Sequence, residues 1–464
     1  MIELVVHPSV LIALKSAFPK PPNSAEKALN NYVGLLEDLI FDDLIKSKDN
    51  FSKLFNLYSI SLNDLMHKSP RLSSKKIRLH SWLQQNNLQL IKTIETGNSI
   101  TKRISVVKLT TNVTLGIKNT ASSPQKMFEY LHPNFNNLSL LEIEKDYDYF
   151  DVDLFSLDRY LQSIYPSNRK PTKKDFILLS LARCIQAAAM FKNGRFYQKK
   201  SPKFFGRTYY EKLSVQNVNK DLRRAMLGDS WEYDIRSSVV SWKLGFAQDY
   251  MNSKNWPGTV ASNFPYCHQY AIDKTFLINQ LAPLVFPLGQ YSPTEMKAKL
   301  KQAMTALNFG AKLQNLVHIN NKGELVKGAM NKILKDEVDV KAFINCQIVK
   351  RFIAEQKALN EFIIEKLVNK DPTVLSYSQL VNKSGKPKPQ VMLAYFYQHA
   401  EWEVMEEVKN IANQNNLTII ANIHDAIIFR DRLSQPLRDQ MQNAMRIKTN
   451  NQFWHLEEKQ ISGY

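Results

Sequence analysis

The sequence lacks the residues that mark several common protein classes. It has only three cysteines, Cys184, Cys267 and Cys346, which lie far apart and form no Cys-x-x-Cys pair. Their number and spacing exclude a disulfide-rich scaffold and a zinc ribbon, and indicate a reducing compartment. The nine histidines are scattered as well, so neither residue type predicts a zinc site.

Long apolar runs are also missing. The best candidate, Phe176 to Phe191, is interrupted by Arg183 and is shorter than the roughly 20 residues of a membrane-spanning helix. The first residues show no basic segment followed by an apolar stretch, so we expect no signal peptide. No internal repeat or low-complexity tract is visible. These absences predict a cytoplasmic protein without a membrane partner.

Acidic residues are fewer than basic ones. The 464 residues include 62 Lys and Arg but 43 Asp and Glu, which gives a net charge of +19 and a pI near 9.5. This excess favours a polyanionic partner, either nucleic acid or an anionic membrane surface, over an ordinary metabolic enzyme. Apolar residues make up 44% of the chain, enough for a large core. The length suggests roughly two to three domains, or one large multi-lobed unit.

About half of the excess charge lies between Pro166 and Arg207, a window that nets +10 because Asp175 is its only acid. Aromatic residues are interleaved with the cations, a mixture that suits a nucleic-acid groove. The nucleic-acid-binding candidates are Arg195, Lys199, Lys200, Lys203 and Arg207. The alternative is a solvated basic loop beside a core helix.

An acidic stretch, residues 141–159, precedes the basic window. It carries seven Asp or Glu residues but has neither the glycine nor the terminal glutamate of a calcium-binding EF-hand. We interpret it as a surface segment or as an intramolecular partner of the basic window.

A first domain boundary is expected at residues 166–171, where two prolines flank a polar run. Residues 1–165 are predicted to form a mostly helical N-terminal region. Residues 166–464 mix strand and helix patterns, beginning with a helix over 175–192, and predict a helix-rich α+β region.

Three segments of this second region carry chemistry. In the first, Trp231, Tyr233 and Ile235 alternate with polar residues and predict a strand with one apolar face. Asp234 then lies on the polar face, and Ser237 and Ser238 can cap a following helix. A carboxylate at such a junction suits metal binding, although a structural aspartate is the commoner case.

The second segment, residues 292–312, predicts a helix. Ser292 and Glu295 form a capping box, and Pro293 occupies the first helical position. One face is predicted to gather polar residues: Lys297, Lys301, Thr305, Asn308 and Lys312. With Phe309 and Gly310 beside it, this face could hold a triphosphate and stack on a base. A solvated face above a core helix is the alternative.

The third segment, residues 417–430, contains two β-rich runs around His424 and Asp425 and predicts a hairpin with this polar pair at its tip. Polar residues inside such apolar strands are costly unless they face a cleft or bind a cation. A turn-forming aspartate remains the alternative.

Taken in order, the three segments resemble motifs A, B and C of the family A-like polymerases, most closely those of phage and mitochondrial single-subunit RNA polymerases. Motif B of that family has a basic residue, a lysine four residues later, then seven residues and Tyr-Gly. Here these positions are Lys297, Lys301, Phe309 and Gly310. The resemblance implies a right-hand fold with palm, fingers and thumb. The palm would comprise about 176–250 and 390–464, the fingers about 251–389, and the thumb or an accessory region would come from residues 1–165.

The resemblance also implies roles for individual residues. Asp234 and Asp425 would hold two Mg²⁺ ions, and His424 would support the hairpin tip and the primer end. Lys301 would act as the general acid for pyrophosphate, and Lys297 would bind the outer phosphates. Phe309 would stack near the nascent base pair and sense the sugar.

An upstream Gly-Arg pair of the family contacts the template. Gly206-Arg207 and Gly194-Arg195 are the two candidates here, and the first is preferred.

The implied activity is DNA-directed RNA synthesis from NTPs on a DNA template. The chain is about half as long as complete single-subunit enzymes. It therefore resembles the larger, catalytic subunit of the two-chain podovirus RNA polymerases, with a second subunit supplying the missing N-terminal parts in the host cytoplasm.

Two departures leave the sugar preference open: Phe309 stands where the RNA polymerases have Tyr, and Val239 is neither the small residue of RNA polymerases nor the Glu of DNA polymerases. The alternatives are a family A-like DNA polymerase or primase, and a non-catalytic nucleic-acid-binding protein.

Overall fold

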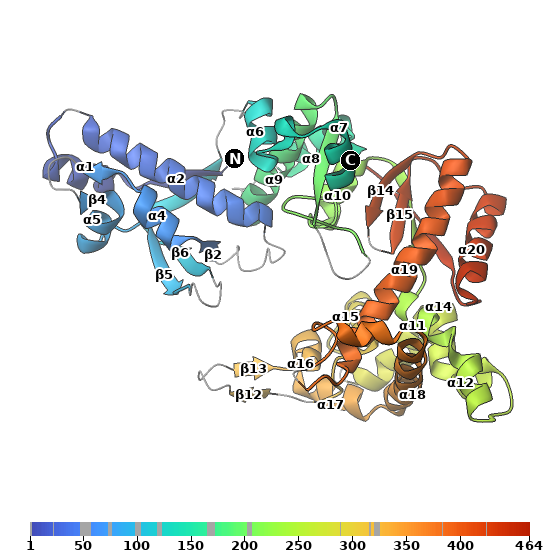
Figure 1. The fold of residues 1–464 in the computed structure, drawn as a ribbon. Helices are drawn as coiled ribbons and strands as arrows, with labels where there is room; N and C mark the ends of the chain where they lie inside the picture. The colour runs from blue at the N-terminus through green and yellow to red at the C-terminus, as the bar shows by residue number, and fades with distance from the viewer. Residues whose placement is uncertain are drawn as a thin grey trace. The chain divides into compact units, whose positions relative to one another are not determined.

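A computed structural model of the protein describes residues 2–21, 23–46, 57–72, 77–97, 104–117, 123–164, 172–201, 207–287, 289–314, 317–319, 325–382, 384–423 and 425–464. It is helix-rich with small antiparallel sheets, as the α+β prediction requires (Figure 1). The chain divides into two compact units. The first comprises 1–202, 209–230 and 461–464, and the second comprises 203–208 and 231–460. Among the described residues, no helix has the length and apolarity needed to cross a bilayer.

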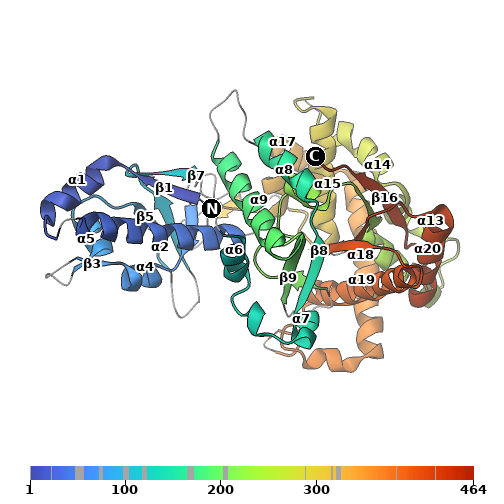
Figure 2. The same cartoon turned by 90° about the horizontal axis from the view of Figure 1, so that it is seen from above.

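The first unit begins with a small α/β group. Its long helix α2 contacts strands β1 and β2, and Figure 2 shows this helix among the other elements of the group. Strand β1 pairs with β7, and β2, β6 and β5 form a three-stranded sheet. The elements of this group are β1 (Ile2–Val6), α1 (Pro8–Ala17), α2 (Ser24–Lys46), β2 (Leu57–Ile60), α4 (Leu62–Lys68), β3 (Arg71–Leu72), β4 (Ile77–Arg78), α5 (Leu79–Gln85), β5 (Ile91–Glu95), β6 (Ser105–Leu109) and β7 (Val113–Ile117).

The rest of the first unit packs helices around the sheet β10-β9-β8. Its elements are α6 (Pro124–Leu131), η2 (Phe135–Asn137), α7 (Leu140–Asp146), β8 (Tyr147–Asp151), α8 (Leu154–Ile164), α9 (Lys173–Phe191), β9 (Arg195–Ser201), β10 (Tyr209–Tyr210) and α10 (Lys220–Leu227). Helix α9 confirms the expected helix over 175–192. It starts two residues earlier because Thr172 and Asp175 form a capping box. The predicted boundary segment, 166–171, lies outside the described residues.

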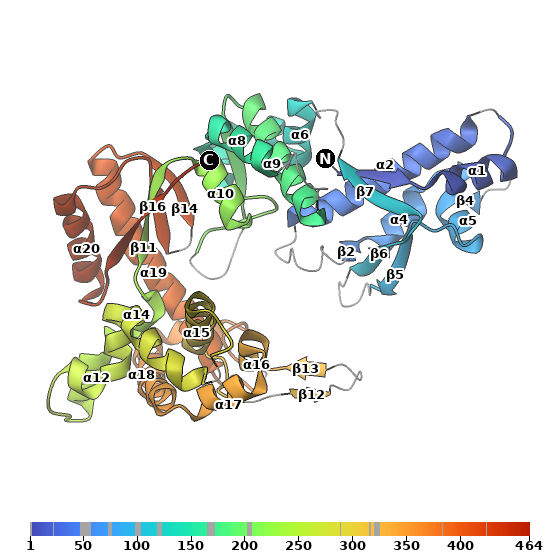
Figure 3. The same ribbon diagram turned by 180° about the vertical axis from the view of Figure 1, so that it is seen from behind.

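The second unit combines a four-stranded antiparallel sheet with a helical part (Figure 3). Its elements are β11 (Ser230–Ile235), α11 (Ser238–Leu244), α12 (Ala247–Ser253), α13 (Val260–Asn263), α14 (Pro265–Val285), α15 (Pro293–Asn308), β12 (Val317–Ile319), β13 (Leu325–Lys327), α16 (Ala329–Leu334), α17 (Glu337–Asn345), α18 (Gln347–Lys370), η3 (Pro372–Ser376), α19 (Pro389–Gln414), β14 (Ile419–Ile423), β15 (Ala426–Phe429), α20 (Gln435–Thr449) and β16 (Leu456–Ile461).

The sheet of the second unit has the order β14-β15-β11-β16. Helices α19 and α20 pack on each other and lie beside the sheet (Figures 1 and 3). One continuous apolar core joins this layer to the helical part, and Tyr233, Trp454 and Phe352 are among its fully buried side chains. Burial of each large apolar side chain contributes roughly 1.5–3 kcal/mol to the free energy of folding. This core therefore stabilises the second unit and holds the elements that carry the candidate site in place.

Candidate functional site

The first candidate aspartate lies where strand β11 leads into helix α11. Tyr233 and Ile235 are buried in the core, so the alternating side chain of Asp234 takes the opposite face, as predicted. Helix α11 begins at Ser238 after a left-handed residue, Ser237 (φ +49°). The expected side-chain cap by Ser237 is wrong, because its hydroxyl donates to the carbonyl of Tyr270 instead.

The second candidate aspartate lies between strands β14 and β15, which form the predicted hairpin. Strand β11 pairs antiparallel with β15, and Asp234 is opposite Ala426 in this register. The backbone amide of Ile235 donates to the carbonyl of Asp425 at 3.1 Å. The hydroxyl of Ser238 donates to Oδ2 of Asp425 at 2.9 Å. Tertiary pairing therefore brings the two predicted carboxylates together. His424 lies outside the described residues.

The environment of Asp234 disfavours a bare negative charge. Burial raises its pKa most, and the carboxylates of Asp425 and Glu232 raise it further, while Lys274 opposes them. Its Oδ1 is buried without a hydrogen-bond partner in the described part of the chain. A buried carboxylate oxygen without a donor is costly, so this oxygen is a natural ligand for a cation.

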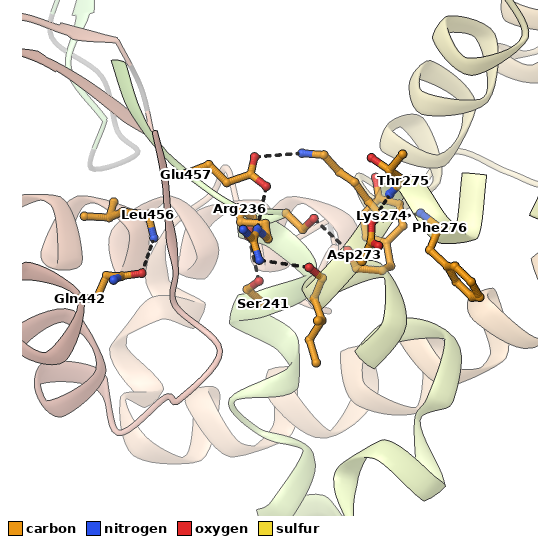
Figure 4. Close-up of polar contacts among 12 residues, drawn as sticks. Arg236, Ser241, Asp273, Lys274, Thr275, Phe276, Gln442, Leu456 and Glu457 are labelled. Carbon is orange, nitrogen blue, oxygen red and sulfur yellow. Dashed lines mark hydrogen bonds and ion pairs between the residues drawn. The ribbon is translucent and has the colours of Figure 1, made fainter. Parts of the chain in front are cut away.

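Two cations, Arg236 and Lys274, share one acid, Glu457, as Figure 4 shows. Arg236 Nε donates to Glu457 Oε1 at 2.6 Å, and Lys274 Nζ lies 3.6 Å from Glu457 Oε2. Arg236 also donates to the carbonyl of Ile272 at 3.1 Å. That carbonyl precedes Asp273, a residue with non-helical backbone angles inside α14, so Arg236 fixes the end of β11 against the kink.

The helix predicted over residues 292–312, which carries Lys297 and Lys301 and is called the lysine helix below, is α15. Its capping box of Ser292 and Glu295 is present, and Leu300, Ala303 and Leu307 are buried. Lys297 and Lys301 are exposed, and neither makes an ion pair within the residues that the structure describes. These two ammonium groups are thus available to an anionic ligand.

The end of this helix differs from the prediction. Helix α15 stops at Asn308, so Lys312 lies beyond it. Asn308 is buried rather than on the exposed face, because its side chain accepts from Gln356 Nε2 at 3.0 Å. Gly310 has φ +84°, a backbone conformation that lets the chain leave the helix and that side chains with a Cβ rarely adopt.

A buried lysine ties three helices together behind this end. Lys243 of α11 is 3% exposed, and its Nζ donates to the carbonyl of Asn308 (3.2 Å) and to Gln356 Oε1 of α18 (2.7 Å). No carboxylate pairs with it among the described residues, and burial lowers its pKa to about 8. Lys243 therefore connects the helix that follows Asp234 to the end of the lysine helix.

A largely apolar cavity of about 360 Å³ lies beside these residues. Val239, Phe309, Gly310 and Tyr397 contribute to its lining, together with residues of α18 and α19. The Phe309 ring is 54% exposed and stands edge-on to Tyr397 at a centroid distance of 6.2 Å. The two residues that left sugar preference open in the sequence, Val239 and Phe309, thus line one cavity.

Arg207 belongs to the second unit and is mostly buried. Its guanidinium group makes a bidentate ion pair with Glu401 of α19 and donates to the hydroxyl of Tyr397 at 3.3 Å. Burial lowers the pKa of Arg207, but the pair with Glu401 outweighs it and the net shift is upward.

The other basic candidates lie in the first unit, on strand β9. This strand pairs antiparallel with β8, and its cations meet acids of the expected acidic stretch: Arg195 lies 3.6 Å from Asp151, and Lys200 lies 2.9 Å from Asp148. Lys199 pairs with Glu211 at 3.6 Å. The interpretation of the acidic stretch as an intramolecular partner is confirmed, and Lys203 lies outside the described residues.

From the sequence, Ser238 was named only as a possible helix cap, and Tyr397, Glu401, Lys243 and Glu457 were not named. Glu401 had a usable signal, because it falls on the stripe of helix α19 that Tyr397, Val404, Met405 and Val408 define, and all of these are buried. A glutamate on a buried helix face needs a partner, although the sequence does not say which. No three or more His, Cys, Asp or Glu residues cluster as a metal site in the described ranges.

Comparison with known proteins adds no identification: no protein-family model matches the chain, and no curated protein matches its sequence.

Proposed function

We propose that this chain is a template-directed nucleotidyltransferase, a DNA-directed RNA polymerase of the single-subunit type, and its catalytic chain. The observation that carries the proposal is that Asp234 on strand β11 lies beside Asp425, which directly precedes the paired strand β15, with Oδ1 of Asp234 buried and unpartnered in the described structure. Two converging carboxylates of this kind suit the metal-assisted transfer of a nucleotidyl group.

The residues fit a magnesium site. Mg²⁺ binds through one or two carboxylates together with water and substrate phosphates, so Asp234 and Asp425 are sufficient protein ligands. A cation between them would offset the repulsion and burial that raise the pKa of Asp234. When bound, Mg²⁺ activates the attacking hydroxyl and neutralises the charge that develops on the phosphates.

The other residues take supporting roles. Lys297 and Lys301 are exposed and without ion pairs in the described chain, which suits binding of the outer phosphates and protonation of the leaving pyrophosphate by Lys301. Phe309 stands exposed at the cavity mouth, where its ring can stack on a base.

The architecture that we propose is a right hand. The palm is the sheet β14-β15-β11-β16 with α19 and α20, and the fingers are the helices between α12 and α18. The first unit would supply thumb or accessory functions. A second protein subunit would complete the enzyme on its DNA template, in the cytoplasm of a bacterial host if a phage encodes it.

A DNA polymerase or primase is the second candidate, because one observation favours it. Val239 and Phe309 both line the cavity, and neither carries a hydroxyl that could bind a ribose 2′-OH. Both candidates place the reaction at the same two aspartates and differ only in the sugar of the nucleotide.

Primer extension on a DNA template tests the proposal, with NTPs and dNTPs compared in the presence and absence of Mg²⁺. We expect incorporation of NTPs that is lost in Asp425→Asn and kept in Asp431→Asn, a matched change at an exposed aspartate six residues later. A preference for dNTPs would favour the second candidate. Equal incorporation by Asp425→Asn and the wild type would refute both candidates. No incorporation by the wild type with either NTPs or dNTPs would leave a non-catalytic nucleic-acid-binding protein.

A further inference from the structure

A continuous chain of polar contacts leads from Asp425 into the core of the second unit. Ser238 donates to Asp425 Oδ2 at 2.9 Å, and the hydroxyl of Tyr397 lies 2.7 Å from Ser238 Oγ. The same hydroxyl contacts Glu401 Oε2, and Glu401 is paired with Arg207. Four residues from three separated segments thus form one series of contacts that ends, through Ser238, on one oxygen of the Asp425 carboxylate.

Burial restricts the movement of the side chains that make these polar contacts. Tyr397 is 2% exposed and Glu401 is 1% exposed. A buried glutamate is costly unless it is paired with a cation. The guanidinium group of Arg207 supplies the positive charge, and its two parallel donors match the carboxylate in a way that a lysine ammonium group cannot. The single hydroxyl hydrogen of Tyr397 has two acceptors within reach, Ser238 Oγ and Glu401 Oε2, so its oxygen is held between them.

This arrangement changes the interpretation of Arg207. Its guanidinium group is already committed to Glu401 and Tyr397, so it is poorly placed to serve a template phosphate. The same tyrosine ring stands edge-on to Phe309, so it also touches the aromatic residue at the cavity mouth.

We infer that Ser238, Tyr397, Glu401 and Arg207 form a positioning relay that fixes the orientation of the Asp425 carboxylate for metal binding. Ser238 holds Oδ2, Tyr397 holds Ser238, and the Glu401–Arg207 pair holds Tyr397. These are positioning residues, since none of them is proposed to touch a substrate. This inference rests on the metal site of the proposed function, and it does not depend on whether the nucleotide is an NTP or a dNTP.

The physical reason is that a carboxylate free to rotate pays an entropic cost when it binds a cation, and a fixed carboxylate does not. Hydrogen-bond partners that orient metal ligands are commonly worth about 10–100-fold in metal affinity or activity. We expect Ser238→Ala and Tyr397→Phe each to weaken binding at the Asp425 site by about 10-fold.

The test measures Mn²⁺ binding to the full chain by electron paramagnetic resonance of the free ion, and so needs no nucleotide or template. The Asp425 site is defined as the binding that Asp425→Asn removes. Ser241→Ala is the matched control: Ser241 lies on the same helix and is buried, but its hydroxyl donates to the carbonyl of Arg236 at 2.9 Å. Ser238→Thr, which keeps a hydroxyl, should restore most of the affinity.

The outcomes separate the two claims. Unchanged Mn²⁺ affinity in Ser238→Ala, or an equal loss in Ser238→Ala and Ser241→Ala, would overturn the relay. Binding that Asp425→Asn does not reduce would overturn the relay together with the metal site. If the wild type binds Mn²⁺ through Asp425 but incorporates no nucleotide, the polymerase proposal fails, and the affinities of the variants still decide the relay.

Discussion

Replacing Lys243 by methionine should change how the stability of the second unit depends on pH. The wild-type lysine is 3% exposed and has no carboxylate partner in the described structure, and burial lowers its pKa from the ordinary 10.5 to about 8. Below pH 8 the amine is charged in both the folded and the unfolded chain, so folding bears the full cost of burying the charge.

The sign follows from proton binding. Between pH 8 and pH 10.5 the unfolded chain holds a proton at this lysine that the folded chain has lost, so the wild type becomes more stable as the pH rises. A shift from 10.5 to about 8, at about 1.4 kcal/mol per pH unit, corresponds to roughly 3–4 kcal/mol. Methionine does not titrate, so the free energy of unfolding of the wild type minus that of Lys243→Met should rise by about 2–3 kcal/mol between pH 7 and pH 10.

Urea unfolding followed by tryptophan fluorescence measures this difference, because five of the six tryptophans, all except Trp82, lie in the second unit. Lys254→Met is the control: this side chain is exposed, so its variant should differ from the wild type by a constant amount across the range. A difference for Lys243→Met that stays flat from pH 7 to pH 10 would refute the reasoning and show that Lys243 reaches water or an unseen partner.

Three further predictions concern the site. Asp234→Asn should stabilise the second unit by about 1 kcal/mol, since it removes a buried repelling charge, while abolishing the response of the melting temperature to Mg²⁺; a destabilised variant would contradict this. Gly310→Ala should cost about 1–2 kcal/mol for its φ of +84° and more for the contact of a Cβ with Gln390 at 3.1 Å. Gly289→Ala is the control: Gly289 has φ +62° but open space around it, so this variant should lose only the free energy that the positive φ costs. Urea unfolding measures both variants. Phe309→Tyr should raise the ratio of NTP to dNTP incorporation, and an unchanged ratio would remove Phe309 from sugar selection.

Local patterns predicted much of the second unit. The alternation around Asp234, the capping box of α15 and the apolar runs around Asp425 each name an element and its buried face, because these depend on neighbours in sequence. The same local rules failed at element ends. Ser237 did not cap α11, and α15 ended at Asn308 because a buried amide contact and a left-handed glycine stop it there.

The basic window shows a different limit. Charge counting located the cations correctly but could not say whether they face solvent or acids. Arg195 and Lys200 meet Asp151 and Asp148 because β8 and β9 pair antiparallel, a register that depends on strands more than 40 residues apart. Exposed pairs of this kind are worth roughly 0–1 kcal/mol each, so they reduce the free charge without excluding a nucleic-acid role.

By itself, the sequence determined which residue types were present and which secondary-structure elements carry them. Hydrophobic period, caps and turns act over a few residues, so Asp234 could be assigned to a strand and Asp425 to a hairpin without knowledge of the fold. The tertiary structure decided which of them meet. The pairing of β11 with β15 placed the two aspartates side by side, and the packing of α19 placed Tyr397 and Glu401 behind them. Contacts between residues so far apart depend on how the whole core fills its space, and no local pattern encodes that.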